Sequence, residues 1–300
     1  MKQEILSIDG KLKVKTPVDK KQELLNDLKE SMSSQKILTG IVGGVEKLKK
    51  NANSPSVAIV WYNDFKIMIP AEECIDIPLD DETDKYQYEH YLLSKRLASE
   101  IDFVIKAIQE ENQIAVASRM EAMMKKRNVH FFEKNSENEY IITEDSIIET
   151  RIVCTTRAGI IVEIFGVETY IPCKELSYQR MQDATQNFFV GERTLVKILS
   201  IDRNEETGEV KIDASVKQAY ENPYDKAMAL YNEEDKYTGT VSMIDHNGVF
   251  VSLNGGIDVL CKAPERGIIP TKGSIVTVKI TIKNEEEKRL FGLITHVARI

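Results

Sequence analysis

Residues that could carry catalysis or bind a metal are scattered along this chain of 300 residues. The phosphate-binding pattern Gly-x-x-x-x-Gly-Lys-[Ser/Thr], the hydrolase pattern Gly-x-Ser-x-Gly and the zinc pattern His-Glu-x-x-His are all absent from the sequence. The pair Asp80-Asp81 lies in a segment predicted to be a loop, where solvated charge is the ordinary explanation. The four histidines show no metal-ligand spacing: His90, His130, His246 and His296. We therefore expect no enzymatic activity, no bound metal and no cofactor.

The cysteines and the apolar runs indicate the cellular compartment. Cys74, Cys154, Cys173 and Cys261 lie far apart, without the Cys-x-x-Cys pair that is typical of zinc sites. The sequence begins without the apolar core of a signal peptide, and its longest apolar runs, such as Val57 to Tyr62, are too short to span a bilayer. These features predict a cytoplasmic protein with free thiols and no membrane segment.

The charge of the chain is unevenly distributed. The formal net charge is −8, which argues against a protein that coats nucleic acid through a generic basic surface. Residues 236–300 nevertheless carry nine Lys or Arg against six Asp or Glu, a balance of +3. Residues 151–235 carry ten against fifteen, and the remaining charge of −6 belongs to the first half. Only the last part of the chain is basic.

Residues 158–217 contain the pattern of one complete small β-domain. Gly159 opens an apolar run, a turn is predicted at Gly166, and a second apolar run ends at Pro172, which together indicate a hairpin. Residues 178–189 favour one or two helical turns, and two further strands are predicted at 195–202 and 210–214. Short strands with one helical interruption are typical of a five-stranded OB-type barrel, whose closure removes exposed sheet edges.

The same pattern recurs before and after this segment. The spacing from Val57 to Pro70 equals the spacing from Gly159 to Pro172, so both prolines are expected at equivalent positions at the end of a third strand. A last copy is predicted to open near residue 236. Five apolar residues are expected to fill the interior of the middle copy: Ile161, Val162, Ile171, Val196 and Ile198.

Five sequence blocks of the middle copy resemble the S-one RNA-binding domain, the OB-fold repeat of the bacterial small-subunit ribosomal protein S-one. They occur in the order and at the spacing of that family. The blocks are Gly159-x-x-Val162, Tyr170-Ile171-Pro172-x-x-Glu175-Leu176-Ser177, Val190-Gly191-Glu192, Val196-Lys197-Ile198-x-x-Ile201-Asp202 and Lys211-Ile212-x-x-Ser215-x-Lys217. The resemblance implies an all-β protein with helical connectors, made of three tandem five-stranded OB-fold barrels plus an N-terminal helix.

The repeat pattern divides the chain into six segments. The N-terminal helix is predicted to begin at Pro17 with Thr16 as its N-cap, and Asn222-Pro223 is expected to start a short connecting helix. The expected segments are an arm and capping helix at 1–35, a divergent first repeat at 36–122, a linker at 123–140, the middle repeat at 141–218, a helical connector at 219–235 and the last repeat at 236–300.

The resemblance also implies where RNA would bind. Members of the family use aromatic residues near a Gly-x-Phe-Val strand, a histidine after the third strand, and an Asp and an Arg of the final hairpin. The last repeat offers Phe250 at the aromatic position, Arg289 as the arginine and Asn284 where Asp is usual, whereas Cys261 stands at the expected histidine position. Weaker candidates for the surrounding groove complete the predicted site: Lys279, Lys262 and His246.

The other two repeats retain less of this pattern. The aromatic position is Ile161 in the middle repeat and Ile59 in the first. Trp61, Tyr62 and Phe65 cluster at a predicted hairpin tip of the first repeat, where core packing combined with a partner-binding patch is favoured over a displaced RNA platform. The resemblance thus predicts a non-enzymatic protein of a bacterium or bacteriophage that binds single-stranded RNA mainly through its last repeat, associated with the ribosome or mRNA. The alternative is a scaffold whose barrels dock onto a protein partner.

Overall fold

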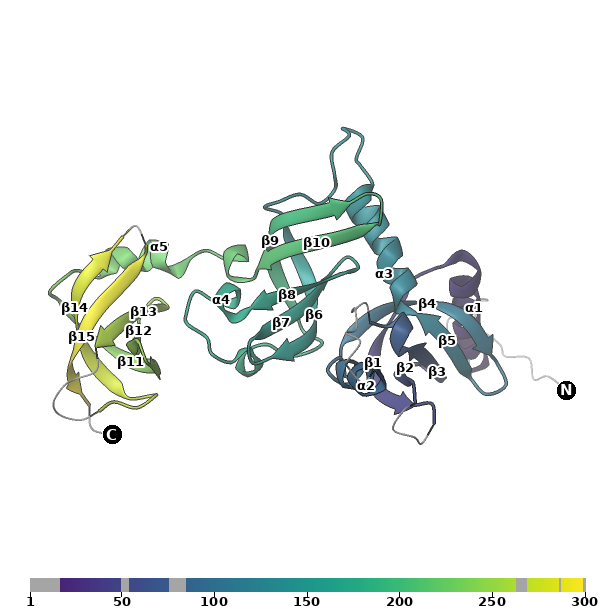
Figure 1. Ribbon diagram of the computed structural model, residues 1–300, viewed down its shortest axis with the longest axis horizontal. Coiled ribbons are helices and arrows are strands. Elements are labelled where there is room, and N and C mark those ends of the chain that lie inside the picture. The colour runs from purple at the N-terminus through teal and green to yellow at the C-terminus, as the bar shows by residue number, and fades with distance from the viewer. Residues whose placement is uncertain (1–16, 50–53, 76–84, 263–268, 286, 299–300) are drawn as a thin grey trace, which may run out of the picture.

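The computed structural model describes residues 17–49, 54–75, 85–262, 269–285 and 287–298, and they form three β-domains in a row (Figure 1). The predicted arm and the N-cap Thr16 lie outside these residues, and so does the segment 263–267, where the repeat pattern predicts a shortened helical interruption of the last repeat. The described chain consists mostly of strands with a few short helices, so the predicted fold class is confirmed.

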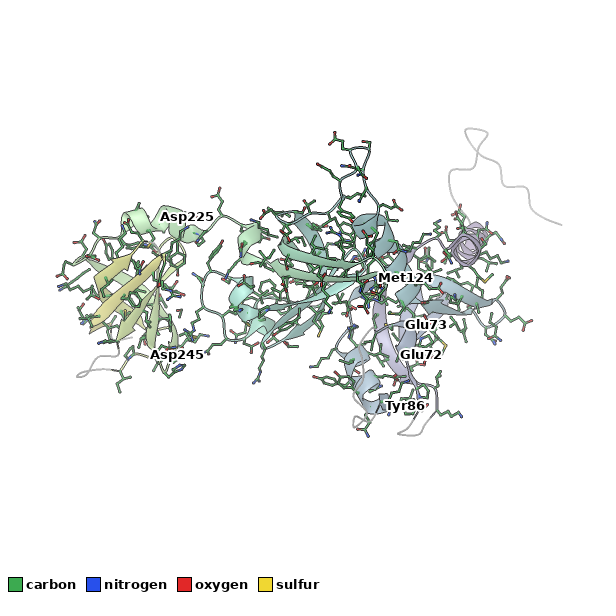
Figure 2. All side chains as sticks on the ribbon, turned by 45° about the horizontal axis from the view of Figure 1, so that its top comes forward. Glu72, Glu73, Tyr86, Met124, Asp225 and Asp245 are labelled. Carbon is green, nitrogen blue, oxygen red and sulfur yellow. The ribbon has the colours of Figure 1, made fainter. Side chains whose placement is uncertain are left out.

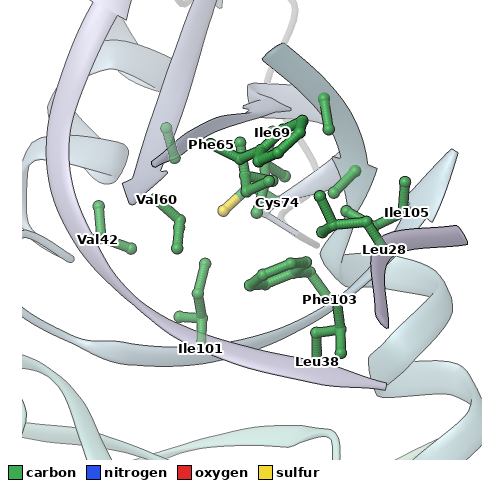
Figure 3. Close-up of a cluster of buried hydrophobic side chains, with 14 of the residues drawn as sticks. Leu28, Leu38, Val42, Val60, Phe65, Ile69, Cys74, Ile101, Phe103 and Ile105 are labelled. Atoms are coloured by element: carbon green, nitrogen blue, oxygen red, sulfur yellow. The ribbon is translucent and has the colours of Figure 1, made fainter. Parts of the chain in front are cut away.

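The first repeat is a closed barrel with the strand order β1-β2-β3-β5-β4. Its strands are β1 (Leu38–Lys47), β2 (Ser56–Tyr62), β3 (Phe65–Pro70), β4 (Glu100–Gln109) and β5 (Ile114–Ser118). Alternate residues of each strand point inward and fill the barrel with aliphatic and aromatic side chains, among them Val60, Ile69 and Phe103 (Figure 3). Helix α1 (Pro17–Ser34) packs on β4 and adds Leu28 to this core, whereas Met32 is exposed.

The middle repeat has the same succession of strands in a five-stranded sheet ordered β10-β9-β6-β7-β8. Its strands are β6 (Ile147–Thr156), β7 (Gly159–Ile164), β8 (Val167–Pro172), β9 (Arg193–Asn204) and β10 (Glu209–Ser215). The two outer strands, β8 and β10, lie in contact with each other, but no ladder pairing joins them among the described residues. A short helix α4 (Cys173–Leu176) follows β8, before the segment 178–189 in which helical turns were predicted, and that segment contains a 3₁₀ turn at Ala184–Gln186.

The last repeat is again a closed barrel, with the order β11-β12-β13-β15-β14. Its strands are β11 (Lys236–Asp245), β12 (Gly248–Leu253), β13 (Ile257–Lys262), β14 (Ile275–Asn284) and β15 (Arg289–Val297). The connector contains the predicted short helix, α5 (Pro223–Ala227), whose N-cap Asn222 accepts a hydrogen bond from the backbone N–H of Tyr224. Met228 and Tyr231 after this helix join the core of the last barrel, so the connector is packed against the barrel.

Two predicted local structures are corrected. The charge run of residues 76–89 predicts a solvated loop, but its described residues from Lys85 onward belong to helix α2 (Lys85–Ser94), which contacts β1 and β2 and buries Glu89 and Leu93. In the linker, helix α3 (Arg119–Arg127) continues into a π-helical turn (Asn128–Phe132). The sequence of residues 131–138 predicts a loop, so the helical structure extends two residues into that segment. Both segments are helical because each buries an apolar side chain in a barrel core. Leu93 of α2 packs in the core of the first repeat, and Phe131 of the π-helical turn packs in the core of the middle repeat.

The register of the hairpins confirms the repeat spacing. Val57 lies opposite Pro70, and Gly159 lies opposite Pro172, so the two prolines are equivalent. Four of the five predicted interior residues of the middle repeat are in its core, but Ile161 is not. Successive strand residues face opposite sides, so Ile160 and Val162 point inward and Ile161 points outward.

A cluster of buried charges joins the first repeat to the middle one. The guanidinium of Arg119, which has no exposed surface, lies 2.7 Å from Glu163 Oε2 and 2.9 Å from Glu168 Oε1. Arg96 Nη2 lies 2.6 Å from Glu168 Oε2. Burial alone would lower the pKa of Arg119, but the two carboxylates outweigh it and raise that pKa, and the guanidiniums in turn keep the pKa of Glu168 below its ordinary value. Arg119 and Glu168 are therefore a charged pair in the folded protein.

The turn of the β7–β8 hairpin fits closely against helix α3. Gly166 adopts a φ of +86°, and a Cβ built on it would lie 2.1 Å from the backbone oxygen of Met123. Only glycine meets both demands, because other residues rarely adopt this φ and any side chain would displace the helix. Beside the turn, the rings of His130 and Phe165 stack with their centroids 4.0 Å apart. This hairpin is therefore the docking element of the middle repeat.

We expect Ile198→Ala to destabilise the middle repeat by about 2–5 kcal/mol, because Ile198 is fully buried and its truncation leaves a cavity. Ile161→Ala is the matched control and should cost much less, since its side chain lies on the outer face. Urea unfolding of both variants measures the difference. Equal stability of the Ile198 variant and the parent would show that the register assigned to this strand is wrong.

Candidate nucleic-acid interface

Phe250 lies on the outer face of the last barrel. Its strand neighbours Val249 and Val251 belong to the core, and Phe250 does not. In the strand pairing, Phe250 lies opposite Leu260, and Leu260 lies beside Phe291 of β15. These three apolar side chains line a cavity of about 790 Å³, a volume in the range of roughly 300–1,000 Å³ that is usual for ligand pockets.

Arg289 and Asn284 lie opposite each other where β14 and β15 meet. The Arg289 side chain is 67% exposed and its Nη1 lies 3.1 Å from Glu287 Oε2. Asn284 Oδ1 accepts a hydrogen bond of 2.9 Å from the backbone N–H of Glu287, so Asn284 shapes the turn of this hairpin. The neighbouring Lys288 pairs with Asp225 of the connector. Arg289 and Lys288 line the cavity with Phe250.

The three weaker candidates do not line this cavity. Lys279 Nζ pairs with Glu234 Oε2 at 2.5 Å, Lys262 is exposed at the end of β13, and His246 is exposed in the turn between β11 and β12. Of the predicted site residues, the structure thus brings Phe250 and Arg289 together on one cavity, with Asn284 in the adjoining turn.

The position assigned to Cys261 needs correction. Val249 pairs with Cys261 in the last repeat as Ile160 pairs with Ile171 in the middle one. The last-repeat equivalent of Pro172 is therefore Lys262, one residue further on. Cys261 points into the core, and burial raises the pKa of its thiol to about 12.

Cations of the middle repeat complete the wall of the cavity. Lys174, Arg180 and Lys217 line it together with Lys288 and Arg289 of the last repeat. The acids in the same lining are Asp258 and Glu287, so cations outnumber acids by five to two. Such a surplus attracts a polyanion even though the chain as a whole is acidic.

Arg180 covers the ring of Phe250. Its guanidinium carbon lies 4.8 Å from the ring centroid, and its Nη2 lies 2.7 Å from Asp245 Oδ2. Phe250 is only 8% exposed as a result, although its side chain lies outside the barrel core. Figure 2 labels Asp245 at the side of the last barrel that faces the middle repeat. Phe250 is therefore neither a core residue nor an open platform in this structure.

Asp258 lies in the same wall with an unsatisfied oxygen. Burial disfavours its ionised form and raises its pKa, an effect that hydrogen bonds from the Arg180 backbone, Ser252 and Ser242 oppose. Its Oδ1 has no hydrogen-bond partner among the described residues. The backbone N–H of Asp258 donates to the hydroxyl of Tyr224, 2.8 Å away, which ties this part of β13 to the connector.

Sequence reasoning missed several of these residues. Phe291 could have been predicted from the sequence, because it follows Arg289 by two residues on one strand and must lie on the same face. Arg180 and Lys174 could not have been predicted, since they belong to the middle repeat and reach the cavity only through the packing of two domains.

The first repeat does not form an equivalent platform. Its position equivalent to Phe250, Ile59, is buried at 2% exposure. The three residues of the predicted aromatic cluster have different environments. Phe65 is in the core, and Tyr62 packs edge-on against Phe103 with ring centroids 6.4 Å apart. Trp61 is 58% exposed. In the middle repeat, Tyr170 is exposed opposite Ile161, but no aromatic side chain occupies the Phe250 position.

Comparison with known proteins identifies the middle repeat. Residues 141–211 match the family described as S1 RNA binding domain. The small ribosomal subunit protein bS1 of Staphylococcus saprophyticus is 27% identical over 168 residues, which cover 53% of this chain and 41% of that protein. The bS1 protein of Staphylococcus aureus is 25% identical over 194 residues, or 62% of this chain and 48% of that protein. The predicted resemblance is confirmed: the chain is S1-like, and it spans less than half the length of these relatives.

A solved structure is also similar at a low level. The crystal structure of a multidomain protein with nucleic acid binding domains from Streptococcus pneumoniae aligns with 87% of this chain and 73% of its own, at 11% identity and a TM-score of 0.20. A likeness this low carries no argument about function. Within the described part of the chain, no helix is long and apolar enough to cross a membrane, and no three acidic, His or Cys side chains are grouped to hold a metal.

We expect Asp258→Asn to change the pH dependence of stability. The raised pKa of Asp258 means that its ionised form opposes folding at neutral pH, and that this penalty disappears as the pH falls through the folded-state pKa. The variant should therefore be more stable than the parent at neutral pH, with an advantage that vanishes toward pH ~4. Thermal unfolding between these pH values, with the exposed Asp64→Asn as control, measures it. A variant that is less stable at neutral pH contradicts the assignment.

Proposed function

We propose that this chain is a non-enzymatic RNA-binding protein that takes single-stranded RNA on the outer face of its last repeat. The observation that carries the proposal is the meeting of Phe250 and Arg289 on one cavity whose lining is dominated by cations. An aromatic face for stacking beside groups for phosphates is what an OB barrel needs to bind a nucleic-acid strand.

The form of the cavity favours single strands over a duplex. Phe250, Leu260 and Phe291 offer an apolar wall that can take an unstacked base, whereas the bases of a duplex are already stacked on each other. Lys288 and Arg289 lie beside this wall and can contact the phosphates of the same nucleotides. The net charge of the whole chain does not oppose this, because the charges that line the cavity are the ones nearest to the RNA.

The comparisons support the nucleic acid and suggest a setting. The family of the middle repeat is described as RNA binding, and the relatives are ribosomal proteins of the small subunit. We therefore propose RNA as the ligand, with the ribosome or a ribosome-bound mRNA as the setting and the cytoplasm as the place. The chain shares only part of the length of those relatives, so association with the ribosome is proposed from their description as ribosomal proteins alone.

Docking onto a protein partner is the second candidate. The exposed Trp61 on the acidic first repeat favours it, since aromatic side chains are enriched in protein interfaces. In that case the cavity of the last repeat would not be needed for binding, and its variants would bind RNA no differently from the parent.

We expect Phe250→Ala to weaken RNA binding about tenfold or more, because a stacked base contributes on the order of 1–3 kcal/mol. Arg289→Ala should weaken binding and lower the slope of log K against log salt concentration by about 0.7 for the phosphate that is no longer neutralised. Fluorescence anisotropy of the full chain with a labelled oligouridylate at several salt concentrations measures both effects.

Two control variants separate this site from general effects. Phe189→Ala removes an exposed aromatic ring of the middle repeat, and Lys272→Ala removes a charge of the last repeat, both outside the cavity. Thermal unfolding shows that each variant is folded. If Phe250→Ala and Arg289→Ala stay folded and bind as the parent does, RNA recognition by this face is excluded.

A further inference from the structure

We infer that the nucleic-acid site is shared by two repeats, and that a base is held between the ring of Phe250 and the guanidinium of Arg180. This inference rests on the proposed function, because it concerns the same cavity. It assigns to the middle repeat a direct part in binding that the pattern of its own strands does not indicate. The ligand class is a flexible single strand with at least one unstacked base.

The contact between Arg180 and Phe250 has the geometry of a closed stack. A guanidinium carbon 4.8 Å from a ring centroid leaves no space for a third planar group. A base is about 3.4 Å thick, judged by the rise per nucleotide of one strand. The guanidinium must therefore withdraw by about this distance for a base to enter, and it then faces the other side of that base. Bases stack on aromatic rings and on arginine planes alike, so both faces of the base are satisfied.

The surroundings of Arg180 allow this movement. Its side chain is 44% exposed, and among the described residues it forms an ion pair with Asp245 at the rim of the last barrel, whose own side chain is 9% exposed. Asp245 Oδ1 also accepts hydrogen bonds from the backbone N–H groups of Asn247 and Gly248, so its carboxylate keeps partners when the guanidinium leaves. The backbone is held more firmly, since the N–H of Arg180 donates to the Asp258 carboxylate and Gln179 Nε2 lies 3.4 Å from Ser252 Oγ. The side chain can move while its loop stays docked.

Lys174 extends the site along the middle repeat. Its side chain is exposed, lines the cavity, and has no acidic partner among the described residues. Lys217 is differently placed, because its Nζ is bound to the Lys174 carbonyl oxygen at 2.7 Å and to Glu175 Oε1 at 3.2 Å. Lys174 is thus the cation available for a phosphate on this side, as Arg289 is on the other. A strand that contacts both crosses the junction between the two repeats.

A permanent cover is the opposite interpretation of the same contact. If Arg180 only shielded Phe250 from the ligand, its removal would open the ring and strengthen binding. If it closes on a base, its removal deletes one stacking face and one positive charge, and binding weakens. The two interpretations therefore predict opposite signs for one substitution.

The test compares Arg180→Ala and Arg180→Lys in the full chain, using a fluorescein-labelled decamer of uridylate and anisotropy titrations over a range of salt concentrations. Arg180→Ala should weaken binding about tenfold, the effect of one lost stacking face, and should reduce the salt slope. Arg180→Lys keeps the charge without the planar face, so it should restore the slope and only part of the affinity. Lys174→Ala should reduce the slope by about 0.7.

Lys197→Ala is the matched control, because this lysine also belongs to the middle repeat, pairs with Asp145 and does not line the cavity. It should bind as the parent does. Equal or tighter binding by folded Arg180→Ala, together with weakened binding by Phe250→Ala, would overturn the shared site and leave RNA on the last repeat alone. If Phe250→Ala and Arg289→Ala also bind normally, the proposed function fails as well. Arg180→Lys, which preserves the cationic contact, keeps the test valid if the alanine variant is unstable.

Discussion

The buried ion cluster of Arg119, Arg96, Glu163 and Glu168 is the contact on which the arrangement of the repeats depends. Two arginines of the first repeat and its helix α3 meet two carboxylates of the middle repeat with almost no exposed surface. Removing one partner of a buried pair typically costs about 3–5 kcal/mol, because it leaves a charge without compensation. The cluster therefore tolerates a single relative placement of the two domains. It also covers the outer face of β7 and β8 near their turn, so this face is not accessible to another molecule.

The junction between the middle and last repeats is built differently. Its polar contacts, such as Arg180 with Asp245 and Gln179 with Ser252, are partly exposed, and they surround a cavity. Contacts of this kind can open locally without loss of either barrel core. The chain thus combines one junction fixed by buried charges with one that is adjustable, and the residues suited to RNA lie at the adjustable one.

Local pattern and spacing predicted most of the fold. The equal spacing from Val57 to Pro70 and from Gly159 to Pro172 located the third strands, because a two-residue alternation and a short turn fix the register of a hairpin. Phe250 was predicted from the family resemblance, whereas Ile161 and Cys261 were each placed one residue out of register. A shift of one residue moves a side chain to the other face of the strand, so Ile161 lies on the surface where an interior residue was expected, and Cys261 lies in the core where a binding residue was expected.

The contacts between domains could not be predicted in this way. Glu163 and Glu168 have the sequence appearance of solvated strand charges, and Arg119 that of a residue at the start of a helix. Their burial follows from the packing of a second barrel against the first, which no periodicity of either segment records. Arg180 is a similar case, since its partner Phe250 is seventy positions further along the chain. The residues that the middle repeat contributes to the proposed site could therefore be found only from the three-dimensional structure.

The most direct test of the account is photochemical crosslinking of the full chain to a uridine-rich single-stranded RNA, with the attached residues located by mass spectrometry of peptides. The account predicts crosslinks in the strands that carry Phe250 and Phe291 and, in the same complex, in residues 174–181 of the middle repeat. Crosslinks confined to the first repeat around Trp61, or absent from both sides of the cavity, would contradict it.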